Sequence, residues 1–148
     1  MAKKSQHPIM SARTRWRMRA VEILYESESR TVPTGQVLKE RAERMRAEPD
    51  SVQQLPDYAV TLARGVDEYR AELDRVLNRA SVGWSVERMA PVDRNVLRVA
   101  LFEVRYIDDV DTPVAIKEAM KVAETIGSSD NPTFINGVLD AAVAIDTD

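Results

Sequence analysis

The spacing of apolar and polar positions along the chain predicts helices from residue 11 onward. The clearest stretch lies in the middle, where apolar residues recur at intervals of three and four, at Leu55, Ala59, Leu62, Val66, Tyr69, Leu73, Val76 and Ala80. This period indicates one long amphipathic helix from about Pro56 to Asn78 that runs through Gly65. Such a helix commonly forms the spine of a helical bundle, although the same spacing would also suit a coiled-coil dimer.

A first helix is predicted to begin after Ser11, whose hydroxyl is a suitable N-cap. Trp16, Ala20 and Leu24 fall on one broad face of this helix. Arg13 and Arg17 continue that face toward the N-terminus, whereas the arginines at 15 and 19 project from the opposite side. The N-terminal tip is therefore expected to overhang the core and to present guanidinium groups in two directions.

Prolines and small polar residues divide the rest of the chain into further helices. The pattern predicts helices from Pro33-Thr34 to before Pro49, a short turn from Ser85 to Met89, and helices from Pro91 to about Tyr106, from Thr112 to Ile126, and from Pro132 onward. Thr112 is expected to act as an N-cap and Gly127 as a left-handed helix terminator. No stretch is typical of a strand, so the sequence predicts an all-α protein with about seven helices.

Composition and charge add one distinctive feature, a basic N-terminal segment on an acidic body. The 148 residues carry a net charge of −3, but residues 1–20 contain six basic and no acidic residues, and the remainder has a net charge of −9. Such an asymmetry is typical of a basic arm that binds polyanions, and also of a solvated tail. Residues 1–10 show no periodicity and are expected to be mobile. The length suits one domain or two small lobes that share a core.

The residue types that carry catalysis are scarce. There is no cysteine, and the single histidine, His7, lies in the polar N-terminus. The sequence therefore does not indicate catalysis by a thiol or an imidazole. No glycine-rich phosphate-binding loop is present, and Asp108, Asp109 and Asp111 lack the spacing of a calcium loop. We therefore expect no enzyme activity, no metal site and no cofactor. No apolar run is long enough to span a membrane, and a cytoplasmic location is the simplest expectation.

Binding of RNA is better supported by the residues. Arg13, Arg15, Arg17 and Arg19 surround Trp16 within seven positions. Guanidinium groups match phosphates bidentately, and an indole can stack on an unpaired base. Packing in the core is an equally good interpretation for Trp16, which lies on the apolar stripe.

Three residues outside the arginine segment have two open interpretations each. Phe134 lies off the main buried stripe of the last helix, so it either stacks on bases or fills the core. Asp130 is either an N-cap or an acceptor for base amino groups. Tyr25 either packs between lobes or contacts a partner protein.

Four segments together resemble the NusB family of transcription antitermination factors. Arg13-Thr-Arg-Trp-Arg17 with Ala20-Val-Glu-Ile-Leu-Tyr25 resembles the arginine-rich first helix of the family, and Val92-Asp-Arg-Asn-Val-Leu-Arg98 resembles its central helix. The most specific matches are Thr112-Pro-Val-Ala-Ile-Lys-Glu-Ala119 and Phe134-Ile-Asn-Gly-Val-Leu139. The resemblance covers residues 11–143. Thr14 and Trp16 interrupt an arginine run that is often denser, and Lys117 replaces the usual asparagine.

The resemblance implies an all-α fold of two small packed helical bundles, which would place an N-terminal subdomain at residues 11–80 and a C-terminal subdomain at 81–148. It also implies binding to the single-stranded boxA element of nascent ribosomal RNA. The implied partners are NusE, a small-subunit ribosomal protein, and the antitermination complex on RNA polymerase.

By position, the resemblance also assigns individual residues. Arg13, Arg15 and Arg17 match the RNA-binding start, and Asp130 and Phe134 match an RNA-proximal loop and aromatic. Contact with the partner protein is implied for Tyr25, Asp93, Arg94 and Leu97.

Two alternatives to this function remain open from the sequence. One is a helical protein-interaction module with a nonspecific basic tail. The other is a stand-alone relative of the N-terminal domain of RNA cytosine methyltransferases. A homodimer through the long helix or the arginine face would mask the RNA site.

Overall fold

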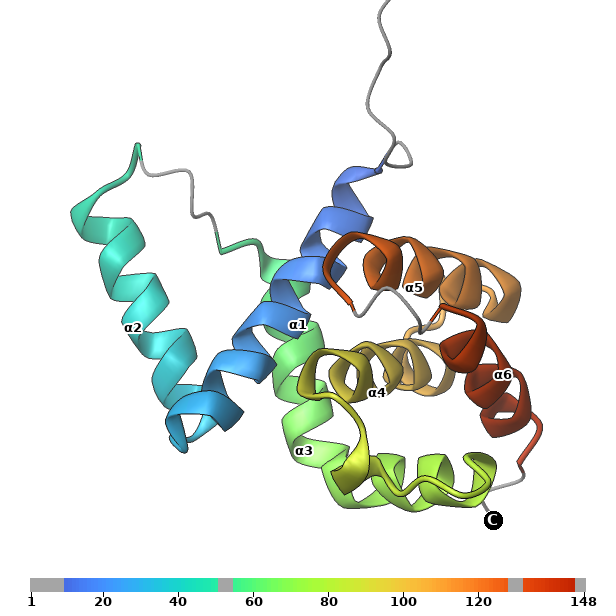
Figure 1. Ribbon diagram of the computed structural model, residues 1–148. Coiled ribbons are helices and arrows are strands. Elements are labelled where there is room, and N and C mark those ends of the chain that lie inside the picture. Colours follow the sequence, from blue (N-terminus) through green and yellow to red (C-terminus); the bar gives the residue numbers. More distant parts are fainter. Residues whose placement is uncertain (1–9, 51–54, 128–131, 146–148) are drawn as a thin grey trace, which may run out of the picture.

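The structure, a computed structural model, describes residues 10–50, 55–127 and 132–145, and all regular elements in these ranges are helical (Figure 1). The elements are α1 (Ala12–Arg30), α2 (Thr34–Ala47), α3 (Asp57–Ala80), the 3-10 helix η1 (Val86–Arg88), α4 (Pro91–Tyr106), α5 (Thr112–Ile126) and α6 (Pro132–Val143). Six α-helices and one 3-10 helix within the described ranges confirm the all-α prediction of about seven helices. None of the described helices is long and apolar enough to cross a lipid bilayer.

Helix α4 lies at the centre of the molecule, because apolar residues occupy most of its circumference. It packs against α1, α3, α5 and α6 (Figure 1). Helices α1 and α4 run antiparallel: Arg17, near the start of α1, pairs with Glu103 near the end of α4, whereas Glu28 pairs with Arg94 in the first turns of α4. One continuous apolar core extends from Ala20 to Ala142 and includes residues on both sides of position 80. The division into two subdomains stays a prediction.

Helix α3 continues through Gly65, as predicted, but it bends at Tyr69, where the backbone leaves helical geometry (φ −104°, ψ 18°). A Cβ atom at position 65 would lie 2.0 Å from the ring of Phe102, so the glycine permits the close approach of α3 to α4. Beside the bend, the rings of Tyr69 and Tyr106 stack with centroids 4.4 Å apart. The bend therefore lies where aromatic rings of α3 and α4 pack together.

The predicted helix starts and stops are mostly confirmed. The differences concern which residue caps α5 and the backbone conformation at its C-terminal end. Ser11 caps α1 through a hydrogen bond that its hydroxyl accepts from the Thr14 amide at 3.1 Å. Thr112 is the first residue of α5 rather than its N-cap, which is Asp111. Gly127 is extended (φ −85°) rather than left-handed, so that prediction is wrong. A side chain there would clash with the Ala123 carbonyl at 2.6 Å.

Candidate nucleic-acid interface

The N-terminal turns of α1 present arginines on the surface. Arg15 is exposed and donates a hydrogen bond to the Met10 carbonyl at 3.2 Å. Arg19 is partly exposed and pairs with Glu22 at 3.2 Å. No acidic residue occupies the first turn, so the positive end of the helix dipole adds to the arginine charges. This end of α1 therefore carries positive charge at the protein surface.

The Arg13 side chain lies along the protein surface, and 38% of it is exposed. Its guanidinium group lies 4.5 Å from the centre of the Tyr58 ring and donates two hydrogen bonds of 3.3 Å to Asp109. The hydrogen bond to Asp109 raises the pKa of Arg13. Because Asp109 is mostly exposed, this pair is of the kind that contributes little to stability and can exchange for a phosphate.

Arg17, which the sequence predicts as an RNA contact, is buried in this fold. Only 4% of the residue is exposed. Its Nε donates to both carboxylate oxygens of Glu103 at 2.8 Å, and its Nη1 donates to the Thr14 hydroxyl at 2.8 Å. Arg17 would have to leave these hydrogen bonds to reach a phosphate, and its contact with RNA stays a prediction. The tip of α1 consequently packs on α4 and α5 instead of overhanging the core.

Two further hydrogen bonds complete the surroundings of Arg17. The Tyr58 hydroxyl donates to Glu103, and the Thr14 hydroxyl donates to Glu118 on α5. Burial and the neighbouring Glu103 carboxylate raise the pKa of Tyr58, so its hydroxyl stays a donor to higher pH than that of a free tyrosine. Sequence reasoning missed this network. The available signal was Glu103, an acidic residue within the predominantly apolar helix from 91 to 106.

Trp16 is partly buried next to Tyr58, with ring centroids 6.3 Å apart and a tilted geometry. Arg13 covers the same tyrosine ring. The structure therefore brings together one cation and two aromatic rings at the exposed end of α1. This combination can bind a phosphate and stack on a base, and it equally fixes the start of α3 against α1.

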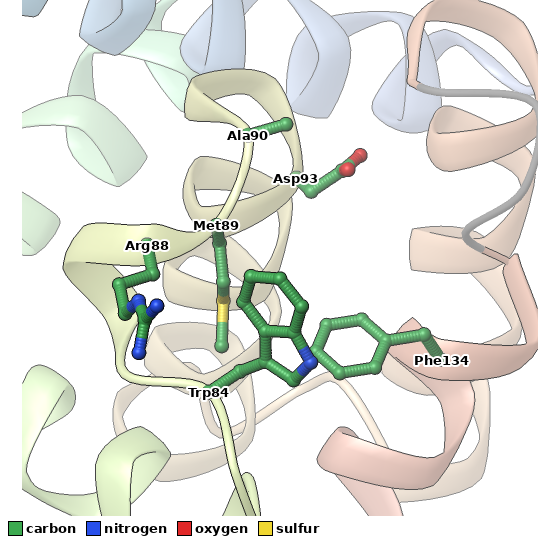
Figure 2. A pocket seen from close by; sticks show the side chains of 6 residues that line it. All are labelled: Trp84, Arg88, Met89, Ala90, Asp93 and Phe134. Atoms are coloured by element: carbon green, nitrogen blue, oxygen red, sulfur yellow. The ribbon is translucent and has the colours of Figure 1, made fainter.

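Phe134 lies at a different place, in a pocket between α6 and the segment that leads into α4 (Figure 2). The pocket has a volume of about 310 Å³ and is lined by Trp84, Arg88, Met89, Ala90, Asp93 and Phe134. Phe134 is half-buried and packs against the apolar core, so it has a packing role in addition to any contact with a ligand. Asp130, the other predicted RNA contact of this region, lies outside the described residues.

The structure does not bring Phe134 and the arginines into one small site. The pocket adjoins the first turn of α4, whereas Arg13 contacts Asp109 beyond the last turn of α4. A helix of 16 residues is about 24 Å long, so the two places are separated by roughly that distance. A ligand that reaches both must be an extended chain.

The four residues implied in contact with a partner protein divide into exposed and buried pairs. Tyr25 is 42% exposed, and Arg94 is partly exposed. Asp93 and Leu97 have no exposed surface (0% each), because α4 is enclosed by its neighbours. A role of Asp93 and Leu97 in contact with a partner protein stays a prediction, because both side chains are enclosed within this chain.

Arg94 belongs to a second charge network, which also escaped sequence analysis. Glu28 on α1 accepts hydrogen bonds from Arg94 at 2.6 Å, from Arg98 at 2.7 Å and from Asn95 at 3.2 Å. Arg98 also donates to Asp74 on α3 at 2.8 and 2.9 Å. Partial burial acts to raise the pKa of Glu28, but the hydrogen bonds from these donors outweigh it and lower that pKa. The network ties α1, α3 and α4 together beneath an open groove.

These features define a class of protein: an all-helical chain with exposed cations and aromatic rings on its surface. Within the described residues, no group of three or more histidine, cysteine, aspartate or glutamate side chains could hold a metal ion. A family model described as NusB family matches residues 14–144. The chain belongs to the NusB family, as the resemblance predicted.

Individual relatives agree with this assignment. The transcription antitermination protein NusB of Bifidobacterium animalis subsp. lactis (strain AD011) is 44% identical over 133 residues, which are 90% of this chain and 84% of that protein. The solved structure of T. maritima NusB superposes with a TM-score of 0.76 at 28% identity, covering 95% of this chain and 96% of that chain. A crystal structure of the antitermination factors NusB and NusE in complex with dsRNA shares the fold, with a TM-score of 0.71 at 22% identity, covering 89% and 97%.

Proposed function

We propose that this chain is a non-catalytic RNA-binding factor of transcription antitermination, which binds boxA-like single-stranded RNA together with NusE. The observation that carries the proposal is the N-terminal end of α1, where Arg13 covers the Tyr58 ring of the Trp16–Tyr58 pair and Arg15 and Arg19 lie on the same turns of the helix. Membership of the NusB family supports the antitermination role, because its curated relatives carry that name.

The proposed mechanism is scaffolding. The α1 arginines hold phosphates, while Trp16, Tyr58 and, farther along the strand, Phe134 meet bases. Two exposed arginines and the partly paired Arg19 give up to three phosphate contacts, so the single-strand affinity should fall with salt at a log–log slope of about −2. The strand must be long enough to cover about 24 Å, the length of α4 between the two places. Asp130, which adjoins Phe134 in the sequence, remains part of the proposal.

We further propose that NusE docks near Tyr25 and Arg94. Tyr25 is exposed on α1. Arg94 lines an open groove of about 660 Å³ with Ser27, Glu28, Thr31, Val32, Pro33, Arg70, Glu87 and Arg98. The groove carries both signs of charge, which suits a polar protein surface. The resulting ternary complex would join RNA polymerase on nascent transcripts in the cytoplasm, and a homodimer that covers α1 would compete with it.

The proposal is tested by fluorescence anisotropy of a labelled boxA-like RNA, titrated with the protein alone and then with NusE. A scrambled RNA and two salt concentrations are the controls. We expect sequence-selective binding that tightens when NusE is added. Equal, weak and salt-sensitive binding to both RNAs would reduce the α1 arginines to a nonspecific polyanion site. Absence of any NusE effect would contradict the ternary complex.

A further inference from the structure

The pocket beside Phe134 contains an exposed tryptophan that the proposed function does not use. Trp84 is 52% exposed, an unusual position for the largest apolar side chain. It lies between α3 and η1, on a turn in which Gly83 adopts a left-handed conformation (φ +88°). The Trp84 amide donates to the Ser81 carbonyl at 3.4 Å, which closes this turn. The local backbone therefore holds the indole at the surface.

The segment that follows Trp84 is also fixed in place. The Asn78 side chain on α3 accepts a hydrogen bond from the Val86 amide at 2.7 Å, which anchors η1 to the end of α3. Met89 is buried below the pocket. Arg88, at the end of η1, places its guanidinium group 5.7 Å from the centre of the Trp84 ring. A cation and an aromatic face are thus prearranged on one short, anchored segment.

The opposite side of the pocket is formed by Phe134 from α6 (Figure 2). Two aromatic side chains from distant parts of the sequence therefore line one opening, with a guanidinium group next to it. The volume of about 310 Å³ lies at the lower end of the range for small-molecule sites, which is sufficient for one planar ring system. An apolar side chain of a partner protein would use the rings but would gain nothing from the adjacent Arg88.

We infer that this pocket binds one unpaired nucleobase of the bound RNA, with Trp84 as the stacking residue and Arg88 as a contact for an adjacent phosphate. The inference rests on the proposed function, and it assigns Trp84 and Arg88 to the base contact near Phe134, about 24 Å from the α1 arginines. Stacking on aromatic side chains next to cations is a general way in which proteins bind single strands without sequence preference. The two anchors together would fix the path of the strand along the molecule.

The test combines variants of Trp84 with an RNA in which each nucleotide in turn is abasic. Trp84→Ala is expected to raise the Kd for the intact RNA roughly 5- to 150-fold, the usual range for losing one stacked base. Trp84→Phe keeps an aromatic face and should stay within about threefold of the wild type. Val82→Ala is the matched control, because Val82 is 93% exposed on the same turn and should have no effect.

The abasic series identifies the base. In the wild type, one position should be sensitive to base removal, and in Trp84→Ala the same removal should cause no further loss, since both changes delete the same contact. Additive losses at every position would overturn the inference. Should Trp84→Ala fail to fold, as judged by circular dichroism, Arg88→Ala in the same series is expected to weaken binding and to reduce the salt slope by about 0.7; an unchanged slope would overturn it.

The outcomes separate this inference from the proposed function. Selective RNA binding by the wild type that Trp84→Ala leaves unchanged would overturn the base pocket and leave the proposed function intact. Loss of NusE binding without loss of RNA binding in Trp84→Ala would make the pocket a protein-docking site, which also contradicts the inference. A wild-type protein that binds no RNA would contradict both the base pocket and the proposed function.

Discussion

Arg15 and Arg17 are two positions apart on α1, yet the structure gives them opposite environments. Arg15 is exposed and makes a single hydrogen bond to a backbone carbonyl. Arg17 is buried and forms hydrogen bonds with Glu103 and Thr14. Two residues correspond to about 200° of rotation around a helix, so one arginine points to solvent and the other into the protein. The arginine-rich segment therefore contains arginines exposed to solvent and an arginine that stabilises the fold.

The largest expected effect is a difference in the free energy of unfolding between variants of the buried and of the exposed arginine. Arg17→Ala should lower the free energy of unfolding by about 3–5 kcal/mol, because Glu103 would remain buried without its cation. Arg15→Ala should change the free energy of unfolding by less than about 0.5 kcal/mol. Urea denaturation followed by circular dichroism measures both. Equal stability of the two variants would contradict a structural role for Arg17.

The second prediction concerns Tyr58, which belongs to the same buried network as Arg17 and Glu103. Tyr58→Phe removes the hydroxyl that donates to Glu103 while keeping the ring beneath Arg13. The expected loss in the free energy of unfolding is about 1.5–3 kcal/mol, the range for a hydrogen bond to a charged group. RNA affinity should change less than threefold, since the aromatic face remains. A loss of RNA binding at unchanged stability would assign the hydroxyl to the ligand instead.

The third prediction concerns the exposed group. The double substitution Arg13→Ala and Arg15→Ala should weaken RNA binding roughly 10- to 30-fold at about 0.1 M salt, and should reduce the log–log salt slope by about 1.4, because two phosphate contacts are lost. Arg75→Ala, which changes an exposed arginine on α3, is the matched control. Anisotropy titrations at several salt concentrations provide the slope. A slope that the double variant leaves unaltered would exclude this end of α1 from the RNA path.

The smallest expected effect uses pH to examine the second network. The pKa of Glu28 is lower in the folded chain than its ordinary value, so its contribution to stability is complete above the unfolded pKa of about 4.3 and is lost as the pH falls through the folded value. Glu28→Gln should therefore be about 1–2 kcal/mol less stable than the wild type at pH 7, and this gap should shrink in acid.

Urea denaturation from pH 7 down to pH 3 measures this gap. Glu22→Gln, a carboxylate that pairs with the partly exposed Arg19, is the control and should cost less than about 0.5 kcal/mol at pH 7. A gap for Glu28→Gln that stays constant with pH would show that the charge of Glu28 is not what stabilises the contact between α1 and α4.

The sequence by itself determined the local structure of this protein. Apolar spacing, prolines and Ser11 predicted the helices closely, because these signals act within one or two helical turns. The arginine segment was also evident from the sequence as a basic feature, and the four family segments predicted the NusB family correctly. The bend of α3 at Tyr69 was not predictable in this way, since it lies where rings of α3 and α4 that are distant in the sequence pack together.

Only the tertiary structure decided which charged and aromatic residues remain available to a ligand. Arg17 and Leu97 matched functional positions in the sequence, but the antiparallel packing of α1 on α4 buries both. The sequence did not indicate that Trp84 is exposed in a pocket. Its position depends on the turn at Gly83, and the pocket depends on the placement of α6. Burial depends on contacts between residues about 20 to 100 positions apart, and helical periodicity carries no information at that range.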